Sequence, residues 1–221
     1  MNIFLDDRII HFSDRQPDNP SSSDLVVPFE SEKQLLEEYR KLEGNLRYRK
    51  MIIVEKPGEM KLSSTGSSGK QSPAVESFFS LFTRVEAAGG LVKNEKGEYL
   101  FIFRLGRWDL PKGKIDKKDH NTDPKEERKT AAIREVKEET GLQTVEITRE
   151  LPSTYHIYTI KDKTILKCTH WFEMSADSAQ PLKPQTSERI FQVKWTPPKA
   201  VHGILSLTYA SLREILLEEI F

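Results

Sequence analysis

The sequence contains a single cysteine, Cys168, among its 221 residues. No intrachain disulfide can form, which favours a reducing compartment over an oxidising one. No apolar run approaches the roughly 20 residues that cross a bilayer. The first residues also lack the basic and apolar regions of a signal peptide. We therefore expect a cytoplasmic protein without a membrane partner.

The chain also lacks net charge, because 34 Lys and Arg residues balance 34 Asp and Glu residues. Such a balance creates no long-range field that attracts polyanions, so we expect no nucleic-acid partner. The Gly-x-Ser-x-Gly pattern of serine hydrolases is missing. The stretch Gly66-Ser67-Ser68-Gly69-Lys70 does not have the full spacing of a phosphate-binding loop, and no apolar strand leads into it. We predict no phosphate role for it.

Cys168 and His170 are two residues apart in an apolar stretch that is typical of a strand. Alternating strand positions point to the same face, so both would lie beside Leu166, Phe172 and Met174. The chain offers no second cysteine, which argues against the usual structural zinc sites. Core packing, rather than zinc binding, is the prediction here.

Residues 1–83 and 84–221 differ in character, and we expect a domain boundary between them. The first part is expected to form a small α/β extension whose role the sequence does not indicate. Its predicted strands cover 2–5, 8–12 and 51–54, its helices cover 31–42 and 74–82, and its loops cover 15–24 and 61–72.

The second part alternates strands with two helical regions. Its predicted strands cover 85–92, 99–104, 145–151, 153–160, 164–174 and 189–196, with helices at 124–140 and from 201 onward. Asp123, Pro124 and Glu126 fit the N-cap, first and third positions of a capping box, which favours a structural role for Glu126. Gly141 is placed to end the same helix.

Three glutamates, Glu135, Glu138 and Glu139, fall on one face of the predicted helix 124–140, because positions three and four apart are neighbours. Carboxylates held that close repel one another unless a cation sits between them. Such hard oxygen ligands suit Mg²⁺ or Mn²⁺. The competing interpretation is a solvated surface helix, which predicts no effect of Mg²⁺ on the melting temperature.

The stretch around these glutamates resembles the signature of the Nudix hydrolases. That signature is a Gly, five residues, a Glu, seven residues, and then Arg-Glu-apolar-x-Glu-Glu-x-Gly-apolar. Residues 134–142, Arg-Glu-Val-Lys-Glu-Glu-Thr-Gly-Leu, match it throughout. Gly113 matches the first Gly, but Asp119 then stands in the Glu position and the following segment is seven residues longer. Counting back from Arg134 instead places Glu126 in the Glu position and His120 in the Gly position, and both alignments stay open.

The resemblance implies an α+β fold for residues 84–221: a Nudix-like α/β/α sandwich with a mixed, largely antiparallel sheet. Residues 87–92, Ala-Ala-Gly-Gly-Leu-Val, are similar to the family's first sheet strand. The implied activity is that of a divalent-metal-dependent pyrophosphohydrolase that cleaves a nucleoside diphosphate linked to another moiety. The alternative is a non-catalytic module that senses nucleotides or ADP-ribose. Residues 1–83 would complete a homodimer interface or cover the substrate cleft.

The resemblance also suggests roles for individual residues. Arg134 would orient a neighbouring carboxylate, and one glutamate would deprotonate the attacking water. Trp108 would line the nucleotide site or, alternatively, cover a core. The expected metal ligands are Glu135, Glu138 and Glu139; the catalytic residues Glu135, Glu138, Arg134 and Glu188; and the substrate-binding residues Arg104, Trp108, Lys112 and Gly113.

Overall fold

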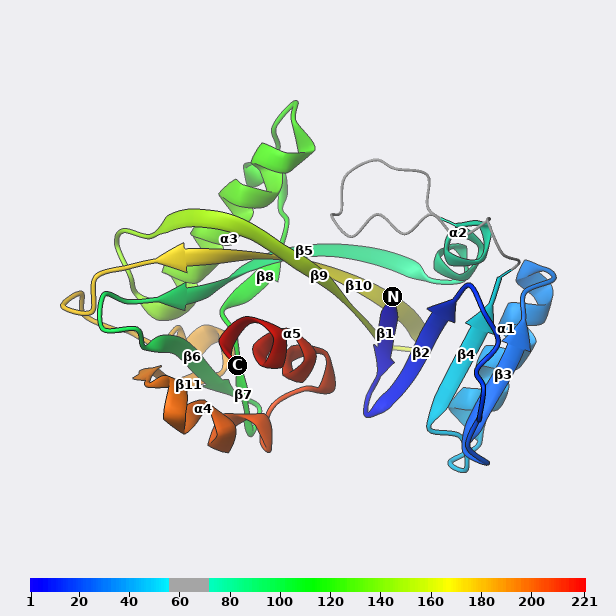
Figure 1. Ribbon diagram of the computed structural model, residues 1–221. Helices are drawn as coiled ribbons and strands as arrows, with labels where there is room; N and C mark the ends of the chain where they lie inside the picture. The colour runs from blue at the N-terminus through cyan, green and yellow to red at the C-terminus, as the bar shows by residue number, and fades with distance from the viewer. Residues whose placement is uncertain (56–71) are drawn as a thin grey trace. The chain divides into compact units, whose positions relative to one another are not determined.

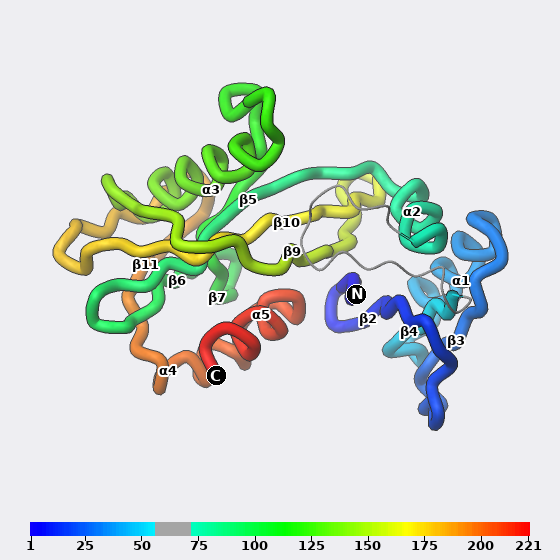
Figure 2. Tube along the Cα trace, turned by 45° about the horizontal axis from the view of Figure 1, so that its top comes forward, coloured from blue at the N-terminus to red at the C-terminus, as the bar shows by residue number. Residues whose placement is uncertain are grey.

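The computed structural model describes residues 1–55 and 72–221. These residues form two compact units, of which the first comprises Met1–Val85 and Tyr155–Lys167, and the second Glu86–Thr154 and Cys168–Phe221. Two long strands, β9 (Glu146–Ile160) and β10 (Lys163–Ser175), contribute residues to both (Figures 1 and 2). The stretch 66–70 and all of the predicted loop 61–72 except Ser72 lie outside the described residues.

The first unit is a mixed sheet with two helices. Its strands follow the order β9-β1-β2-β4-β3, in which β1 and β2 are antiparallel and the other neighbouring strands are parallel. The structure confirms the strands predicted at 2–5, 8–12 and 51–54 and the helices predicted at 31–42 and 74–82. The strand β3 was not predicted. The elements are β1 (Asn2–Leu5), β2 (Arg8–Ser13), β3 (Asp24–Pro28), α1 (Glu32–Gly44), β4 (Lys50–Val54) and α2 (Pro73–Ser80).

The core of the first unit explains why residues from the middle of the chain belong to it. Ile157 and Leu166 are fully buried in the same cluster as Ile3, Leu35 and Phe78. Burying such side chains contributes about 1.5–3 kcal/mol each. Residues 155–167 therefore pack with the N-terminal residues, although the sequence prediction assigned them to the C-terminal part. The division of the chain at residue 84 stays a prediction.

The second unit contains a sheet in the order β11-β6-β5-β10-β9. Two short strands extend it, β7 on β6 and β8 on β5, and both pairings are antiparallel. The predicted strands 145–151 and 153–160 form one continuous strand, β9, while β7 and β8 were not predicted. The remaining strands are β5 (Thr83–Lys93), β6 (Tyr99–Arg104), β7 (Arg107–Asp109), β8 (Lys112–Lys114) and β11 (Ile190–Thr196).

Helices cover both faces of this sheet (Figure 1). The helix α3 (Pro124–Thr140) packs through Val136 against Phe172 of β10. The helices α4 (Pro198–Leu205) and α5 (Ala210–Ile220) pack in a separate cluster that contains Trp171. Adjacent strand residues point to opposite faces. Trp171 therefore lies in the cluster on one face of the sheet, with α4 and α5, and Phe172 in the cluster on the other face, with α3. The predicted α/β/α sandwich is confirmed.

The ends of α3 are set by local contacts. Asp123 accepts a hydrogen bond from the Lys125 N–H (2.9 Å), but the predicted capping box does not form because the Glu126 carboxylate binds Lys129 Nζ instead (2.7 Å). Gly141 ends the helix with a left-handed φ of 84°. Among the residues described, no helix has the length and apolar composition needed to cross a membrane.

Candidate active site

The C-terminal part of α3 lies against β8, and Gly113 is the point of closest approach. A Cβ atom built on Gly113 would overlap the carboxylate of Glu135. Gly113 is also paired with Ala88 in the sheet, so β8 cannot move away from the helix without losing that pairing. A side chain at this position would displace the Glu135 carboxylate, so the absence of one lets Glu135 lie against the sheet.

Arg134 connects α3 to the turn that precedes it. Its Nε donates to Asp119 Oδ1 and its Nη2 to Asp119 Oδ2, both at 2.7 Å, while Nη2 also reaches the carbonyl oxygen of Lys114 (2.9 Å). The Nη1 atom binds Glu135 Oε1 (2.6 Å) and Glu138 Oε2 (3.0 Å). The guanidinium thus holds two glutamates of α3 and is itself held by Asp119.

This geometry favours one of the two alignments of the sequence signature. Asp119 is buried and binds Arg134, whereas Glu126 is exposed and binds Lys129. Asp119 ends a short 3₁₀ turn, η1 (Lys117–Asp119), and its Oδ2 accepts from the Asp116 N–H (2.8 Å). The extra residues lie in the connection 120–123 and in the first turns of α3. The contact with Arg134 therefore favours Asp119 for the position that Glu has in the signature, and the assignment stays a prediction.

Glu139 binds a second cationic side chain, that of Arg104. Its Oε1 binds Arg104 Nη1 (3.1 Å) and its Oε2 accepts from the Lys112 backbone N–H (2.8 Å). Burial raises the pKa of Glu139 to about 7, although Lys112 and Arg104 oppose the rise. Glu188, in the 3₁₀ turn η2 (Thr186–Glu188), lies 3.9 Å from the other terminal nitrogen of Arg104. Arg104 thus stands between a buried and an exposed carboxylate.

The three predicted metal ligands are consequently divided between two arginine side chains, Arg134 and Arg104. Within the described part of the chain, Glu135, Glu138 and Glu139 do not bring one oxygen each to within 4.8 Å of the others. Arg134 binds two of them and Arg104 binds the third, and their assignment as metal ligands stays a prediction. The side chains are 13%, 39% and 2% exposed, respectively.

The donor chemistry of these residues nevertheless fits a hard divalent cation. Burial raises the pKa of Glu135 as well as that of Glu139, so both carboxylates would be stabilised by additional positive charge. They lie in the last turns of α3, where the helix dipole also favours a cation. Glutamate oxygens are suitable ligands for Mg²⁺ or Mn²⁺. The glutamates that would hold such an ion are Glu135, Glu138 and Glu139.

The model of the family described as the NUDIX domain matches residues 83–217 of this chain, more than half of its length. The chain belongs to the Nudix family. Nudix domains are typical of pyrophosphohydrolases, and the family typically uses a divalent metal. The mixed α/β fold of the second unit agrees with this assignment, and a β/α extension precedes the domain.

Solved structures with a similar fold include several Nudix proteins. The MutT protein from Methanosarcina mazei Go1 is 23% identical, with a TM-score of 0.47 over 62% of this chain and 93% of that one. A C. elegans Ap4A hydrolase binary complex is 23% identical, with a TM-score of 0.44 over 61% and 93%. The NUDIX domain of Shewanella oneidensis NrtR complexed with ADP ribose is 18% identical, with a TM-score of 0.44 over 62% and 86%. At these identities the likeness concerns the fold alone.

Trp108 and Lys112, two of the expected substrate-binding residues, have environments that differ from each other. Trp108 is half-buried, packs against Phe103 with ring centroids 5.0 Å apart, and has Lys194 Nζ 4.1 Å from its ring centroid. The Lys112 ammonium is bound by the buried carboxylate of Asp109. The backbone N–H of Lys112 donates to Glu139, and the charge of its side chain also lowers the Glu139 pKa.

Sequence reasoning missed Asp109 and Lys194 as neighbours of the site. Asp109 lies three residues before Lys112 and binds its ammonium. An acidic and a basic residue at this spacing are common in the sequence, so the spacing alone does not identify the pair. Lys194 reaches Trp108 because β11 and β6 are neighbours, and β7 pairs with β6 in turn. Only the strand order brings Lys194 close to Trp108. A groove of about 750 Å³, lined by Glu146 among other residues, contains none of the predicted site residues.

Proposed function

We propose that the protein is a divalent-metal-dependent pyrophosphohydrolase that cleaves a nucleoside diphosphate linked to another moiety. The candidate substrate classes are nucleoside polyphosphates, dinucleoside polyphosphates and ADP-ribose-like compounds. The observation that carries the proposal is the single ionic network around Arg134, in which Asp119 holds the guanidinium and the guanidinium holds Glu135 and Glu138. Membership of the Nudix family supports it.

In this proposal a bound Mg²⁺ or Mn²⁺ supplies charge neutralisation at the phosphates and activation of water. The residues of the chain hold the acidic groups in place. Glu135 is fixed by Gly113 on one side and by Arg134 on the other. A carboxylate fixed by packing and by an arginine needs little reorganisation when charge develops in the transition state.

We assign the proton-accepting role to Glu138. It is the most exposed of the three glutamates, at 39%, so water can reach its carboxylate. Its two oxygens bind Arg134 Nη1 (3.0 Å) and Lys118 Nζ (3.1 Å), and the second partner is itself exposed. Glu139 is unsuited to this role because it is 2% exposed and both of its oxygens have buried or half-buried partners.

Arg104 is proposed to contact a substrate phosphate. Its guanidinium is 21% exposed and lies between Glu139 and Glu188. Of these two carboxylates, Glu188 is exposed and 3.9 Å away, a distance at which an ion pair in water contributes little. A phosphate can therefore replace Glu188 as a partner of Arg104, and Glu188 is then available for the metal or the attacking water.

The experiment that tests this function is product analysis on a panel of phosphoanhydrides in the presence of Mg²⁺ or Mn²⁺. The panel contains nucleoside triphosphates, diadenosine polyphosphates, ADP-ribose and nucleotide sugars. Glu138→Gln should lower kcat by about 100-fold or more, since removal of a general base costs about 10²–10⁴. The matched control is Glu126→Gln, on the exposed first turn of the same helix, which should leave kcat unchanged.

Two other outcomes would contradict the proposal. Metal-dependent nucleotide binding without turnover would indicate the non-catalytic sensing module. Turnover that is equal in the wild type and in Glu138→Gln would show that the acidic end of α3 does not carry the chemistry. The compounds that are hydrolysed distinguish the three substrate classes, and the products identify the phosphorus atom that is attacked.

A further inference from the structure

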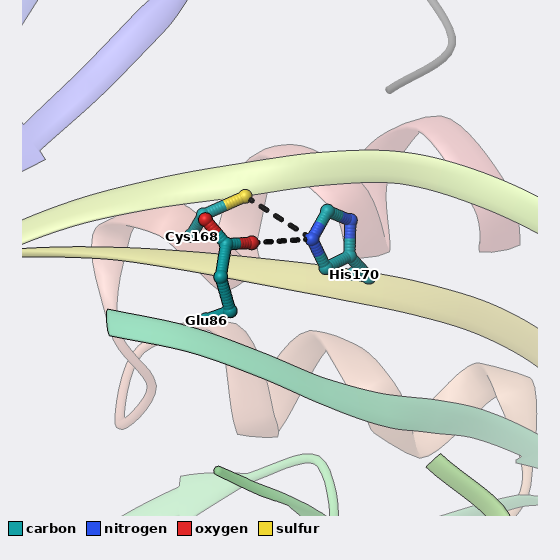
Figure 3. A group of neighbouring side chains, drawn as sticks. All are labelled: Glu86, Cys168 and His170. Atoms are coloured by element: carbon teal, nitrogen blue, oxygen red, sulfur yellow. Dashed lines mark hydrogen bonds and ion pairs between the residues drawn. The ribbon is translucent and has the colours of Figure 1, made fainter. Parts of the chain in front are cut away.

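A second group of potential ligands lies on the sheet of the second unit and includes none of the acidic residues of α3. It consists of Glu86 on β5 and of Cys168 and His170 on β10 (Figure 3). His170 Nε2 is 2.7 Å from Glu86 Oε2 and 3.7 Å from Cys168 Sγ. One ligand atom from each residue lies within 4.8 Å of the other two. We call these three residues the Glu86 cluster.

The position of the Glu86 cluster differs from ordinary core packing. Cys168 and His170 are buried, as the sequence predicts, but their functional atoms point toward each other and toward Glu86 (Figure 3). Glu86 belongs to the neighbouring strand and is 84 residues from His170 in the sequence. Its side chain is 38% exposed, so solvent and ions can reach the group from that side.

We propose that the Glu86 cluster binds one Zn²⁺ ion through Cys168 Sγ, His170 Nε2 and a carboxylate oxygen of Glu86. Thiolate, imidazole and carboxylate are the three ligand types that Zn²⁺ uses in proteins, and three protein ligands leave one position for water. A thiolate and a carboxylate carry two negative charges, which the ion neutralises. A neutral group is far cheaper to bury than separate charges.

The distances are compatible with tetrahedral coordination. Zn–S and Zn–N bonds of about 2.3 and 2.05 Å place the two ligand atoms roughly 3.6 Å apart, and the Cys168–His170 separation is 3.7 Å. The His170–Glu86 separation of 2.7 Å would have to increase by about 0.6 Å, because tetrahedral N and O ligands are roughly 3.3 Å apart. Glu86 can make this movement since its side chain is partly exposed.

Ser153 supplies an independent observation in favour of the site. Its Oγ lies 3.1 Å from Nδ1 of His170. When Nδ1–H donates to Ser153, the lone pair of Nε2 points at Cys168 and Glu86. A polar partner on the second ring nitrogen is the usual arrangement around metal-binding histidines, where it fixes the tautomer and the ring orientation.

The test is a Co²⁺ titration of the metal-free full chain, followed by absorbance. Cobalt bound to a thiolate gives a charge-transfer band in the near ultraviolet, whereas cobalt bound to carboxylates alone does not. We expect this band to saturate at one equivalent of Co²⁺ and to be displaced by Zn²⁺. Cys168→Ser should abolish it, while Glu138→Gln, which alters only the acidic end of α3, should retain it.

A second pair of variants protects the test against loss of folding. Glu86→Gln changes a partly exposed side chain and should weaken Zn²⁺ binding, measured by competition with a chromophoric chelator, with an unchanged circular dichroism spectrum. Ser153→Ala keeps all three ligands and should weaken it about 10–100-fold. The control Ser206→Ala, on an exposed serine whose hydroxyl donates to the Gly203 carbonyl, should not.

Three results would overturn the proposal. They are a wild-type protein without a thiolate band, a band that survives Cys168→Ser, and Zn²⁺ affinity that is unchanged in both Glu86→Gln and Ser153→Ala. None of these readouts measures hydrolysis, so the zinc site and the proposed pyrophosphohydrolase activity stand or fall separately.

Discussion

Arg134 and Asp119 face each other across two parallel hydrogen bonds of 2.7 Å, one from Nε and one from Nη2. The Asp119 side chain is almost completely buried, whereas that of Arg134 remains 15% exposed. The pair connects the 3₁₀ turn η1 to the middle of α3, 15 residues along the chain. A bidentate Arg–carboxylate pair also fixes orientation, so Asp119 determines where Arg134 directs its remaining donors.

Replacement of Asp119 by Asn should destabilise the protein in a pH-dependent way. Burial raises the pKa of Asp119, but hydrogen bonds from Arg134 and from the Asp116 N–H outweigh it and bring the pKa below its ordinary value of 3.8. The folded pKa is thus the lower one, so the stabilisation is complete above pH 3.8 and is lost as pH falls through the folded value. We expect a deficit of about 3 kcal/mol at pH 6 that narrows below pH 4.

Urea unfolding of the wild type and of Asp119→Asn between pH 6 and pH 3 measures this difference. Glu126→Gln serves as the control, because its exposed pair with Lys129 should contribute at most about 0.5 kcal/mol. A deficit for Asp119→Asn that stays constant across the pH range would show that the ion pair is not its cause.

Introducing a methyl group at Gly113 should reduce turnover. The new Cβ would overlap the Glu135 carboxylate and push it away from β8. A misplacement of about 1 Å in a catalytic group can cost about 10² in rate, so we expect kcat of Gly113→Ala to fall by about 100-fold. The free energy of unfolding of Gly113→Ala and of the double variant Gly113→Ala/Glu135→Ala tests whether the overlap is the cause. If it is, the second substitution should restore stability without restoring turnover. Wild-type turnover in Gly113→Ala would contradict the contact.

Gly141 and Gly203 should respond in opposite directions to replacement by Ala. Gly141 has a φ of 84° and a Cβ there would also meet Lys183, so Gly141→Ala should destabilise by about 1–2 kcal/mol. Gly203 lies inside α4, and apart from its neighbours in the chain and the backbone of its own helix no described atom lies within 4 Å of the position that a methyl group would occupy there, so Gly203→Ala should stabilise by about 0.5–1 kcal/mol. Thermal unfolding gives the melting temperature of each variant. Equal changes in melting temperature would contradict the explanation from the backbone conformations of Gly141 and Gly203.

Addition of Mg²⁺ to the metal-free protein should raise its melting temperature. A ligand at 100 times its dissociation constant stabilises the folded state by about 2.7 kcal/mol. The shift should be smaller in Glu135→Gln and in Glu138→Gln, and it should persist in Cys168→Ser, because that residue is not at the acidic end of α3. If Mg²⁺ has no effect even in the wild type, α3 is a charged surface helix and not a metal site.

Elements whose determinants are local were predictable from the sequence. Ser31 caps α1 by accepting from the Gln34 N–H, and Gly141 ends α3, because both effects act within one helical turn. Local reasoning failed at Pro152, where two predicted strands are one. Proline removes a single donor and is tolerated at an exposed position of a strand with a free side, so β9 continues through it. Periodicity also identified Glu135, Glu138 and Glu139 as neighbours on α3.

Contacts between distant residues were decided by the tertiary structure alone. Glu139 meets Arg104, 35 residues away, and Glu135 meets Gly113, because α3 packs on the sheet at β8. Glu86 meets His170 across 84 residues because β5 and β10 are neighbours in the sheet. The sequence determined which acidic groups occupy one helix, since helical spacing is fixed by backbone geometry. Helical spacing also gives Glu135 and Glu138 their shared partner Arg134, whereas the packing of α3 on the sheet determined that Glu139 meets Arg104.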